Sequence, residues 1–334
     1  MITANSLSEQ PKSWQQLWRE AVRDPRELLE MLALPHLASQ ISDQAAAQFP
    51  VRVPIGFVAK MRRGDANDPL LRQVLPLLAE DELAEGFSFD AVGDAVAKGG
   101  TGIIHKYQGR ALLITTGSCA IHCRYCFRRH FPYAEETAAS SNWAEAIAYL
   151  KSDTGISELI LSGGDPLSLS TSKLKELTDA LVSLPNIKRL RIHTRLPVVL
   201  PERVDVELTS WLEALPWPVV LVIHANHANE LTRDVADAVL RLRQHDVTVL
   251  NQAVLLKGVN DVAAEQIRLS EHLFEIGVLP YYLHQLDKVQ GAAHFQISDQ
   301  QARDIRQSMM RALPGYLVPK LVQEVPGEAS KTPL

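Results

Sequence analysis

Cys119-Ala-Ile-His-Cys123-Arg-Tyr-Cys126 contains all three cysteines of the 334-residue chain, spaced C-x3-C-x2-C. An apolar run, Arg110–Thr116, leads into this stretch, so we expect a strand to end just before it and the cysteines to lie on the loop that follows. Thiolates bind soft metals and iron–sulfur clusters. Three thiolates leave one iron of a [4Fe–4S] cluster open to another ligand, and the spacing therefore predicts a cluster of this kind.

Other interpretations of the cysteines explain less. A zinc site needs a fourth ligand, for which His122 or His130 is a candidate. A disulfide is disfavoured, because three cysteines are bunched on one loop and no secretory signal precedes them. Buried, unreactive cysteines stay possible, but they would leave the spacing to chance.

The composition limits the classes of protein to consider. The net charge of −5 gives no basic field that would attract nucleic acid or an anionic membrane surface, and the hydrophobic content of 46% suffices for a large core. No apolar run approaches the length of a membrane span. The first residues, 1–8, lack the charged and apolar segments of a secretory signal. We therefore expect a cytoplasmic protein, where thiols stay reduced.

The pattern along the chain predicts three regions. Residues 1–100 are expected to be mostly helical, with a capping box at Ser13 to Gln16, a helix starting at Asp24-Pro25 and another over 37–49. We find no catalytic constellation there and expect a helical cap on the following domain. Residues 101–298 alternate strands and helices. Residues 299–334 begin as a helix, 299–313, and end in a tail punctuated by proline and glycine.

The alternation in 101–298 comprises six β/α units. The expected strands are 111–115, 158–161, 189–193, 219–224, 248–254 and 278–283, and the expected helices between them are 143–151, 171–184, 206–215, 230–245 and 263–276. Such alternation predicts a parallel sheet with right-handed crossovers and chemistry at the carboxyl ends of its strands. Six units are too few for a complete (β/α)8 barrel, and alternation alone equally allows a doubly wound sheet.

Several stretches together resemble the radical S-adenosylmethionine (SAM) enzymes, and within them the lysine 2,3-aminomutases. The stretches are 102–110, the cysteine loop with Arg128-Arg129, Leu161-Ser-Gly-Gly-Asp-Pro-Leu167, 195–203, 224–227, 251–261 and 286–295. The subgroup they resemble most is associated with elongation factor P and makes (R)-β-lysine. The resemblance implies an α/β fold, an incomplete (β/α)6 barrel, with an N-terminal helical segment and a C-terminal tail that closes the site.

The resemblance also implies a role for each candidate residue. Cys119, Cys123 and Cys126 would hold the [4Fe–4S] cluster, and SAM would lie against Ser162, Gly163, Gly164, Asp165 and His224. Pyridoxal 5′-phosphate (PLP) would contact Tyr107, Arg110 and Gln252 and be held covalently by the catalytic Lys331. The substrate carboxylate would bind Arg128, and its distal ammonium would bind Asp287 and Glu324. Glu324 stands where the family often has Asp, and Glu328-Ala-Ser330 departs from the glycine-rich turn of the family.

The implied reaction converts L-lysine to β-lysine through a 5′-deoxyadenosyl radical. The implied partners are an electron donor, elongation factor P and its β-lysine ligase. No zinc site is expected, since the chain lacks the additional cysteines of the larger aminomutases, and the oligomeric state is left unassigned. Competing functions are an aminomutase of glutamate or arginine, a radical SAM enzyme without PLP such as a methylthiotransferase, and an iron–sulfur electron carrier.

Overall fold

The computed structural model describes residues 12–141 and 143–334, and it contains a ten-stranded sheet in the order β1 to β10. The strands that are parallel to one another are β3 (Arg110–Thr116), β4 (Glu158–Gly163), β5 (Arg189–Thr194), β6 (Val219–His224), β7 (Thr248–Val254), β8 (Leu279–His284) and β9 (Lys320–Gln323). The antiparallel strands at the two edges are β1 (Lys98–Gly100), β2 (Ile103–Tyr107) and β10 (Thr332–Pro333). The expectation for residues 1–8 lies outside the described residues.

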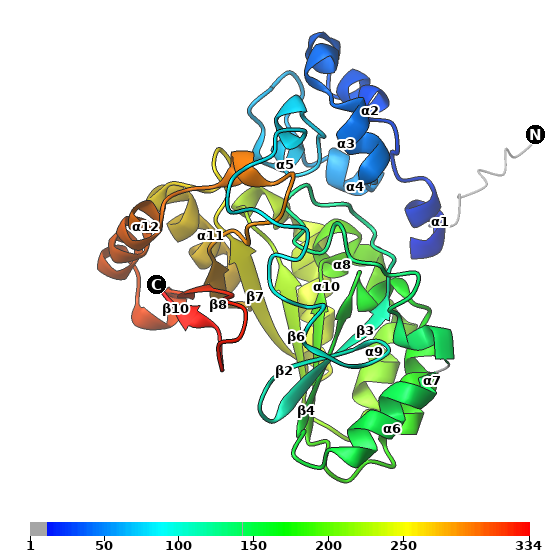
Figure 1. Ribbon diagram of the computed structural model, residues 1–334. Helices are drawn as coiled ribbons and strands as arrows, with labels where there is room; N and C mark the ends of the chain where they lie inside the picture. The colour runs from blue at the N-terminus through cyan, green and yellow to red at the C-terminus, as the bar shows by residue number, and fades with distance from the viewer. Residues whose placement is uncertain (1–11, 142) are drawn as a thin grey trace, which may run out of the picture.

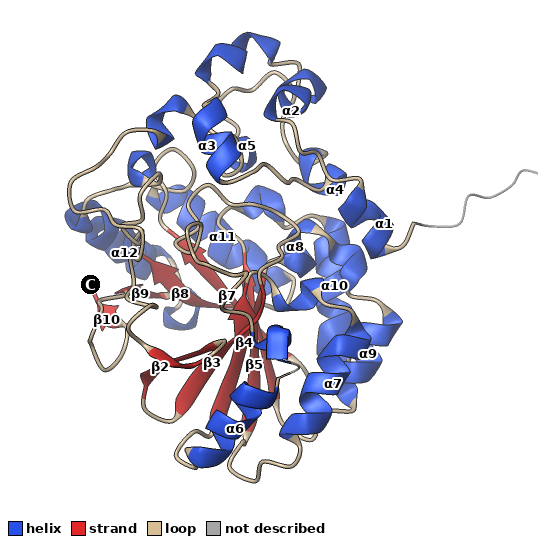
Figure 2. Cartoon of the chain, turned by 45° about the vertical axis from the view of Figure 1, so that its right-hand side comes forward, coloured by secondary structure: helices blue, strands red, loops and turns tan. Residues whose placement is uncertain are grey.

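A helix connects each parallel strand to the next. These helices are α6 (Ala144–Ser152), α7 (Thr171–Leu181), α9 (Val206–Glu213), α10 (Arg233–Gln244), α11 (Ala263–Glu275) and α12 (Asp299–Ala312), with the short α8 (Leu196–Val199) before α9. Figure 2 shows them around the outside of the curved sheet. In α10 the buried residues Val235, Ala238, Val239 and Leu242 recur at helical spacing and face the sheet. The predicted α/β fold with an incomplete barrel is confirmed.

The C-terminal tail contributes two strands that the sequence pattern did not predict. β9 adds to β8 in parallel, and β10 turns back to pair with β9, with Thr332 opposite Gln323. The turn between them has Pro326 followed by Gly327 at φ 87°, and the Glu328 N–H donates to the Val325 carbonyl. Proline and then a residue with positive φ define a type II turn. Departure from the glycine-rich family pattern therefore leaves a well-formed hairpin.

The N-terminal region packs over one end of the partial barrel (Figure 1). Its helices are α1 (Trp14–Arg19), α2 (Pro25–Met31), α3 (Asp43–Gln48), α4 (Ile55–Val58) and α5 (Pro69–Arg72). Ser13 and Gln16 form the predicted capping box, and Asp24 caps α2. The single helix predicted over 37–49 is wrong: a 3₁₀ helix, Pro35–Gln40, ends where Ile41 bridges to Leu77, and Ser42 then caps α3. Tertiary pairing overrides local propensity at this point.

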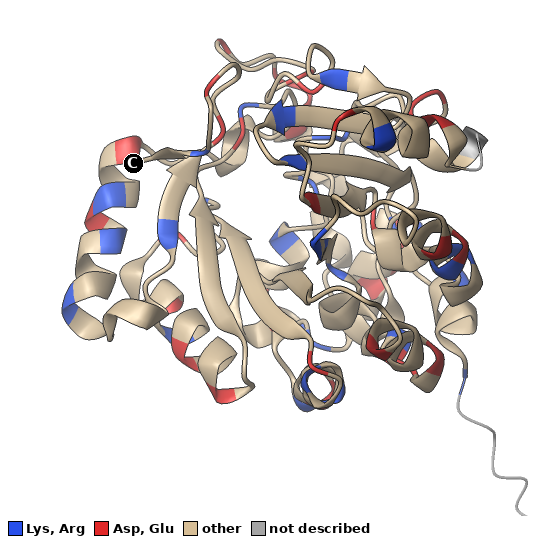
Figure 3. Cartoon of the chain, turned by 90° about the horizontal axis from the view of Figure 1, so that it is seen from below, with Lys and Arg blue, Asp and Glu red and all other residues tan. Residues whose placement is uncertain are grey.

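Further 3₁₀ helices are Leu78–Glu80, Ala138–Ser141, Pro166–Ser168, Pro201–Arg203, Ala228–Glu230, Ala293–Phe295 and Gly315–Leu317. Charged residues of both signs are interspersed along the outer helices and loops, whereas the parallel strands carry few of them (Figure 3). Within residues 12–141 and 143–334, none of the helices combines the length and the apolar character that crossing a bilayer requires.

Candidate active site

A cavity of about 340 Å³ lies on the inner face of the curved sheet, and all fifteen candidate residues line it. The cysteine loop and the Ser162–Asp165 loop form one end of it. Arg110 begins β3 and lines the same cavity, although the other six residues of the strand separate it from the cysteine loop. At roughly 3.3 Å per residue, the cavity extends along a whole strand. The candidate site is therefore inside the partial barrel as well as at its carboxyl end.

Alternation along the strands explains which side chains reach the cavity. Successive residues of a strand point to opposite faces, so residues two apart share one face. The inner-face positions that line the cavity include Ile160 and Ser162 on β4, Arg191 and His193 on β5, Gln252 and Val254 on β7, and Tyr282 and His284 on β8. Polar residues at alternate positions of buried strands indicate a polar inner face, and this pattern is present in the sequence. His193 and His284 were missed because only motif residues were considered.

The N-terminal region holds the backbone of the cysteine loop. The His122 N–H donates to the Arg52 carbonyl at 3.0 Å, and the Arg124 N–H donates to the Gln73 carbonyl at 2.9 Å. Within the loop, the Cys126 N–H donates to the Cys123 carbonyl at 3.0 Å. The loop conformation therefore depends on residues that precede the barrel.

Two buried arginines next to the cysteines share one carboxylate. Glu80 accepts from Arg124 at 2.6 Å and from Arg129 at 2.7 Å. The Arg124 guanidinium also donates to the Phe49 and Ala45 carbonyls. Removing one partner of such a buried pair is strongly destabilising. Arg129, which had no role assigned from the sequence, thus links the cysteine loop to the N-terminal region.

The Ser162–Asp165 loop presses against the cysteine loop. The Gly164 N–H donates to the Thr116 carbonyl at 2.7 Å, and the Asp165 N–H donates to the Ser118 carbonyl at 2.7 Å. A Cβ on Gly164 would lie 2.5 Å from the Ser118 carbonyl oxygen. Glycine is needed here because two backbone segments meet, rather than only for approach to a ligand.

The Asp165 side chain ties two loops together. Its carboxylate accepts from the backbone N–H groups of Leu167, Arg195 and Leu196 and from the Thr194 hydroxyl at 2.7 Å. Burial raises the pKa of Asp165, and these hydrogen bonds oppose the rise. The structure therefore places this carboxylate as a brace between the ends of β4 and β5, at the edge of the cavity.

The side chains of Gln252 on β7 and His224 on β6 form a hydrogen bond with each other. The Gln252 amide nitrogen lies 2.5 Å from His224 Nε2. Burial lowers the pKa of His224 to about 3, and it also holds the pKa values of His193 and His284 well below the usual range. The imidazoles on the cavity wall are consequently neutral at physiological pH, and they can donate or accept hydrogen bonds without adding charge.

The β2–β3 hairpin brings two PLP candidates together. Tyr107 pairs with Arg110 across a two-residue turn, and the Arg110 guanidinium lies 4.5 Å from the centre of the Tyr107 ring. The Tyr107 hydroxyl donates to Glu324 at 2.6 Å, and Lys331 Nζ donates to the other Glu324 oxygen at 2.5 Å. Burial would raise the pKa of Glu324, but Lys331 and Tyr107 outweigh it and hold the pKa below its usual value. The β9–β10 hairpin thus places Lys331 inside the cavity.

Arg128 has partners that the sequence analysis missed. Its Nε donates to Asp94 at 2.7 Å and its Nη1 to the Ser162 hydroxyl at 3.3 Å, while Lys106 pairs with the other Asp94 oxygen at 2.7 Å. Lys106 precedes Tyr107 on β2, within a stretch already singled out. Asp94 comes from the region before the barrel and carried no local signal. A guanidinium has five N–H donors, so Arg128 retains donors for a ligand.

Asp287 lines both this cavity and a second one of about 450 Å³ beyond it. Burial raises the pKa of Asp287 to about 7, and the positive charge of Lys331 opposes the rise. A cationic ligand would favour the ionised form. Asp287 and Glu324 together make this end of the cavity suited to an ammonium group.

The residues fit the cofactors that the pattern implies. Three free thiols line one wall, and each would bind a different iron of a cluster. In the described part of the chain, no three His, Cys, Asp or Glu residues are grouped for one metal ion; His122 Nδ1 is bonded to the Pro50 carbonyl instead. Carbonyls of the Ser162–Asp165 loop, called the glycine loop below, can accept hydrogen bonds from the ammonium of SAM. Lys331 with nearby Arg110 and Lys106 suits an aldehyde that carries a phosphate.

Comparison with known proteins defines the class first. Residues 113–269 match the model of the Radical SAM superfamily. The matched segment contains the cysteine loop, the glycine loop and the strands β4 to β7, so the chain is a radical SAM enzyme.

Full-length relatives then define the family. The L-lysine 2,3-aminomutase of Escherichia coli is 45% identical over 100% of this chain and 97% of the relative. The enzyme of Haemophilus influenzae is 45% identical over 99% of this chain and 98% of the relative. The enzyme of Clostridium subterminale is 32% identical over 95% of this chain and 77% of the relative. The chain belongs to the L-lysine 2,3-aminomutase family.

Proposed function

We propose that this protein converts L-lysine to β-lysine with a [4Fe–4S] cluster, SAM and PLP. The observation that carries the proposal is that Lys331, Glu324 and Asp287 line the same cavity as the three cysteines. A lysine for covalent attachment, two acids for a cation and a cluster-binding loop are the three components that the reaction requires.

The chain's own side chains would position the substrate by its two ends. Arg128 would bind the substrate carboxylate through donors that Asp94 and Ser162 do not use. Asp287 and Glu324 would bind the distal ammonium, as opposite charges suit it. Fixing both ends selects the length of the substrate chain. Glutamate fits poorly, because its distal carboxylate would face these two acids.

The cofactors would supply the difficult chemistry. The cluster and SAM would provide a radical that removes hydrogen from C3 of lysine. PLP would provide a conjugated ring that supports migration of the nitrogen from C2 to C3. Lys331 would hold PLP between turnovers, and Tyr107, Arg110 and Gln252 would orient it. Lys331 is now paired with Glu324. Glu324 would therefore accept either the Lys331 ammonium or the substrate ammonium, which couples release of Lys331 to arrival of lysine.

We further propose that the product is (R)-β-lysine and that it is used by a ligase to modify elongation factor P. An electron donor would reduce the cluster. The resemblance to the subgroup associated with that factor supports this role. A cavity formed partly by the β9–β10 hairpin favours free lysine over lysine already attached to a protein.

The test is an anaerobic assay of protein reconstituted with iron, sulfide and PLP, given SAM, dithionite and one amino acid. We expect L-lysine to give β-lysine, identified by mass spectrometry after chiral derivatisation, and glutamate and arginine to give no rearranged product. A parallel reaction contains lysylated elongation factor P. Rearrangement of glutamate but not lysine would contradict the proposed substrate, and rearrangement only of protein-bound lysine would contradict the use of free lysine.

A further inference from the structure

We propose that Arg195 is a positioning residue for the iron–sulfur cluster: its guanidinium donates to the sulfur of Cys123 and raises the reduction potential of the cluster. This inference rests on the cluster within the proposed function, and it concerns a residue of the 195–203 stretch whose side chain has no role in the site described above.

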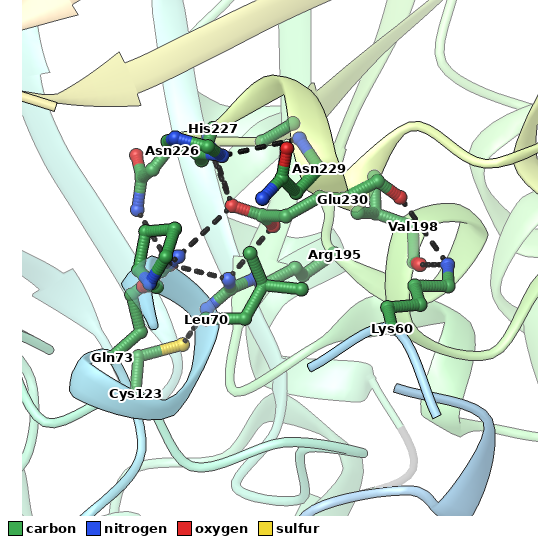
Figure 4. A network of polar contacts seen from close by, with 12 residues as sticks. Lys60, Leu70, Gln73, Cys123, Arg195, Val198, Asn226, His227, Asn229 and Glu230 are labelled. Atoms are coloured by element: carbon green, nitrogen blue, oxygen red, sulfur yellow. Dashed lines mark hydrogen bonds and ion pairs between the residues drawn. The ribbon is translucent and has the colours of Figure 1, made fainter. Parts of the chain in front are cut away.

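The guanidinium lies directly against the thiol (Figure 4). Arg195 Nη1 is 2.6 Å from Cys123 Sγ and 2.8 Å from the Tyr125 hydroxyl, so one nitrogen serves two residues of the cysteine loop. Arg195 is 6% exposed and immediately follows β5. Its backbone N–H donates to Asp165 at 2.7 Å, so the base of the side chain is anchored to the glycine loop.

The other nitrogen is held by a buried network (Figure 4). Arg195 Nη2 donates to Gln73 at 2.7 Å and to Glu230 at 3.0 Å. Glu230 is fully buried and also accepts from the Gln73 amide and the Asn226 backbone N–H. These contacts come from three parts of the chain, which restricts the guanidinium to one orientation, with Nη1 toward the sulfur.

The network also connects to the N-terminal region. Gln73 is the C-cap residue of α5, and Lys60 Nζ, just after α4, donates to the Glu230 and Val198 carbonyls at 3.2 and 2.9 Å. A counter-ion for Arg195 would need only Glu230. The additional contacts fix the orientation of the Arg195 guanidinium. A hydrogen bond to sulfur requires such an orientation, whereas charge balance alone does not.

The consequence for the cluster follows from charge. Reduction adds one electron, and the added negative charge is spread over the irons and the sulfurs that bind them. A positively charged donor at a ligating sulfur stabilises the reduced form more than the oxidised form, because hydrogen bonds to the sulfurs tune cluster potentials. Arg195 therefore makes the cluster easier to reduce.

The experiment measures the potential of the reconstituted, SAM-free cluster by redox titration followed by electron paramagnetic resonance. Arg195→Gln should move the midpoint to a more negative value, with a reduced-to-oxidised ratio about tenfold lower at fixed poise, which is about 59 mV for a one-electron couple. Arg195→Lys keeps the charge but not the fork, and it should give a smaller shift of the same sign. The measurement needs neither lysine nor PLP, so failure of the proposed reaction would not alter it.

Arg203→Gln is the matched control. Arg203 is fully buried and lies in the same connection after β5, but it donates to Leu167, Leu169 and Thr171 rather than to the cysteine loop. It should leave the midpoint unchanged. An unshifted midpoint in Arg195→Gln with full iron content would overturn the proposal. If that variant does not hold the cluster, Arg195→Lys decides: an unshifted or more positive midpoint there also overturns it.

Discussion

Asp287 should control the pH dependence of lysine use. Burial raises its pKa to about 7, so the carboxyl is largely protonated below that pH. If the substrate ammonium binds the ionised carboxylate, kcat/KM for lysine should be constant above pH 7 and fall about tenfold for each pH unit below it. The pKa of Asp287 is raised relative to that of an ordinary aspartate. The loss of kcat/KM therefore occurs as the pH decreases through 7, rather than through about 4.

The histidines of the cavity wall, Glu324 and Tyr107 do not titrate in this range. The pKa values of His193, His224 and His284 lie far below it. The pKa of Glu324 is held below its usual value and that of Tyr107 is raised. We therefore assign a single inflection near pH 7 to Asp287. Glu324 and Asp94, which act on its pKa, have pKa values below their usual range.

The assay compares initial rates between pH 5.5 and 8 in the wild type, Asp287→Asn and Glu324→Gln. Asp287→Asn should remove the inflection and lower kcat/KM at pH 8 by roughly thirty-fold or more, since losing one partner of a buried charge pair costs about 2–5 kcal/mol. Glu324→Gln should also lower kcat/KM but retain the inflection. Iron and PLP content should be unchanged in Asp287→Asn. An inflection near pH 7 that persists in Asp287→Asn would refute the assignment.

Three further predictions concern the cofactors and the cysteine loop. Borohydride reduction of PLP-loaded protein followed by peptide mapping should find the label on Lys331, and a label on Lys320 would show that the tail is misassigned. Single changes of the three cysteines to Ala should each abolish reductive cleavage of SAM, and full cleavage in any of them would contradict the cluster assignment; the variants are Cys119→Ala, Cys123→Ala and Cys126→Ala. Glu80→Gln should lower the free energy of unfolding by about 3 kcal/mol in urea titrations, because Arg124 and Arg129 lose their shared carboxylate, whereas the exposed pair tested by Glu176→Gln should change it by less than about 0.5 kcal/mol.

The sequence predicted the β/α framework because hydrophobic periodicity is a local signal. The six expected strands all occur, with ends shifted by a residue or two. β9 was missed because its four residues, Lys320–Gln323, sit between prolines and show no extended alternation. Its strand character comes from pairing with β8, which no local pattern reveals. The break at Ile41 has the same cause, since its partner Leu77 is distant in sequence.

The candidate site shows the same division. Motif residues such as the cysteines and Gly164 were identified because spacing or resemblance marked them. Residues that act through partners were not: Asp94 gains meaning only beside Arg128, and Glu230 only beside Arg195. The role of Asp165 as a brace was also hidden, because its partners Thr194 and Arg195 lie at the end of a different strand, β5.

We expect the contact between the N-terminal region and the cysteine loop to affect the order of events on heating. Segments that share hydrogen bonds and buried ion pairs open as one cooperative unit, and neighbouring units can open at different temperatures. The His122 and Arg124 amides and the Glu80 carboxylate join the loop to residues 45–80. Detachment of that region would release the loop while the parallel sheet is still folded. On a temperature ramp, iron–sulfur absorbance would then disappear before the helical circular dichroism does. The lifetime of the cluster would therefore measure how stably the N-terminal region is packed on the barrel.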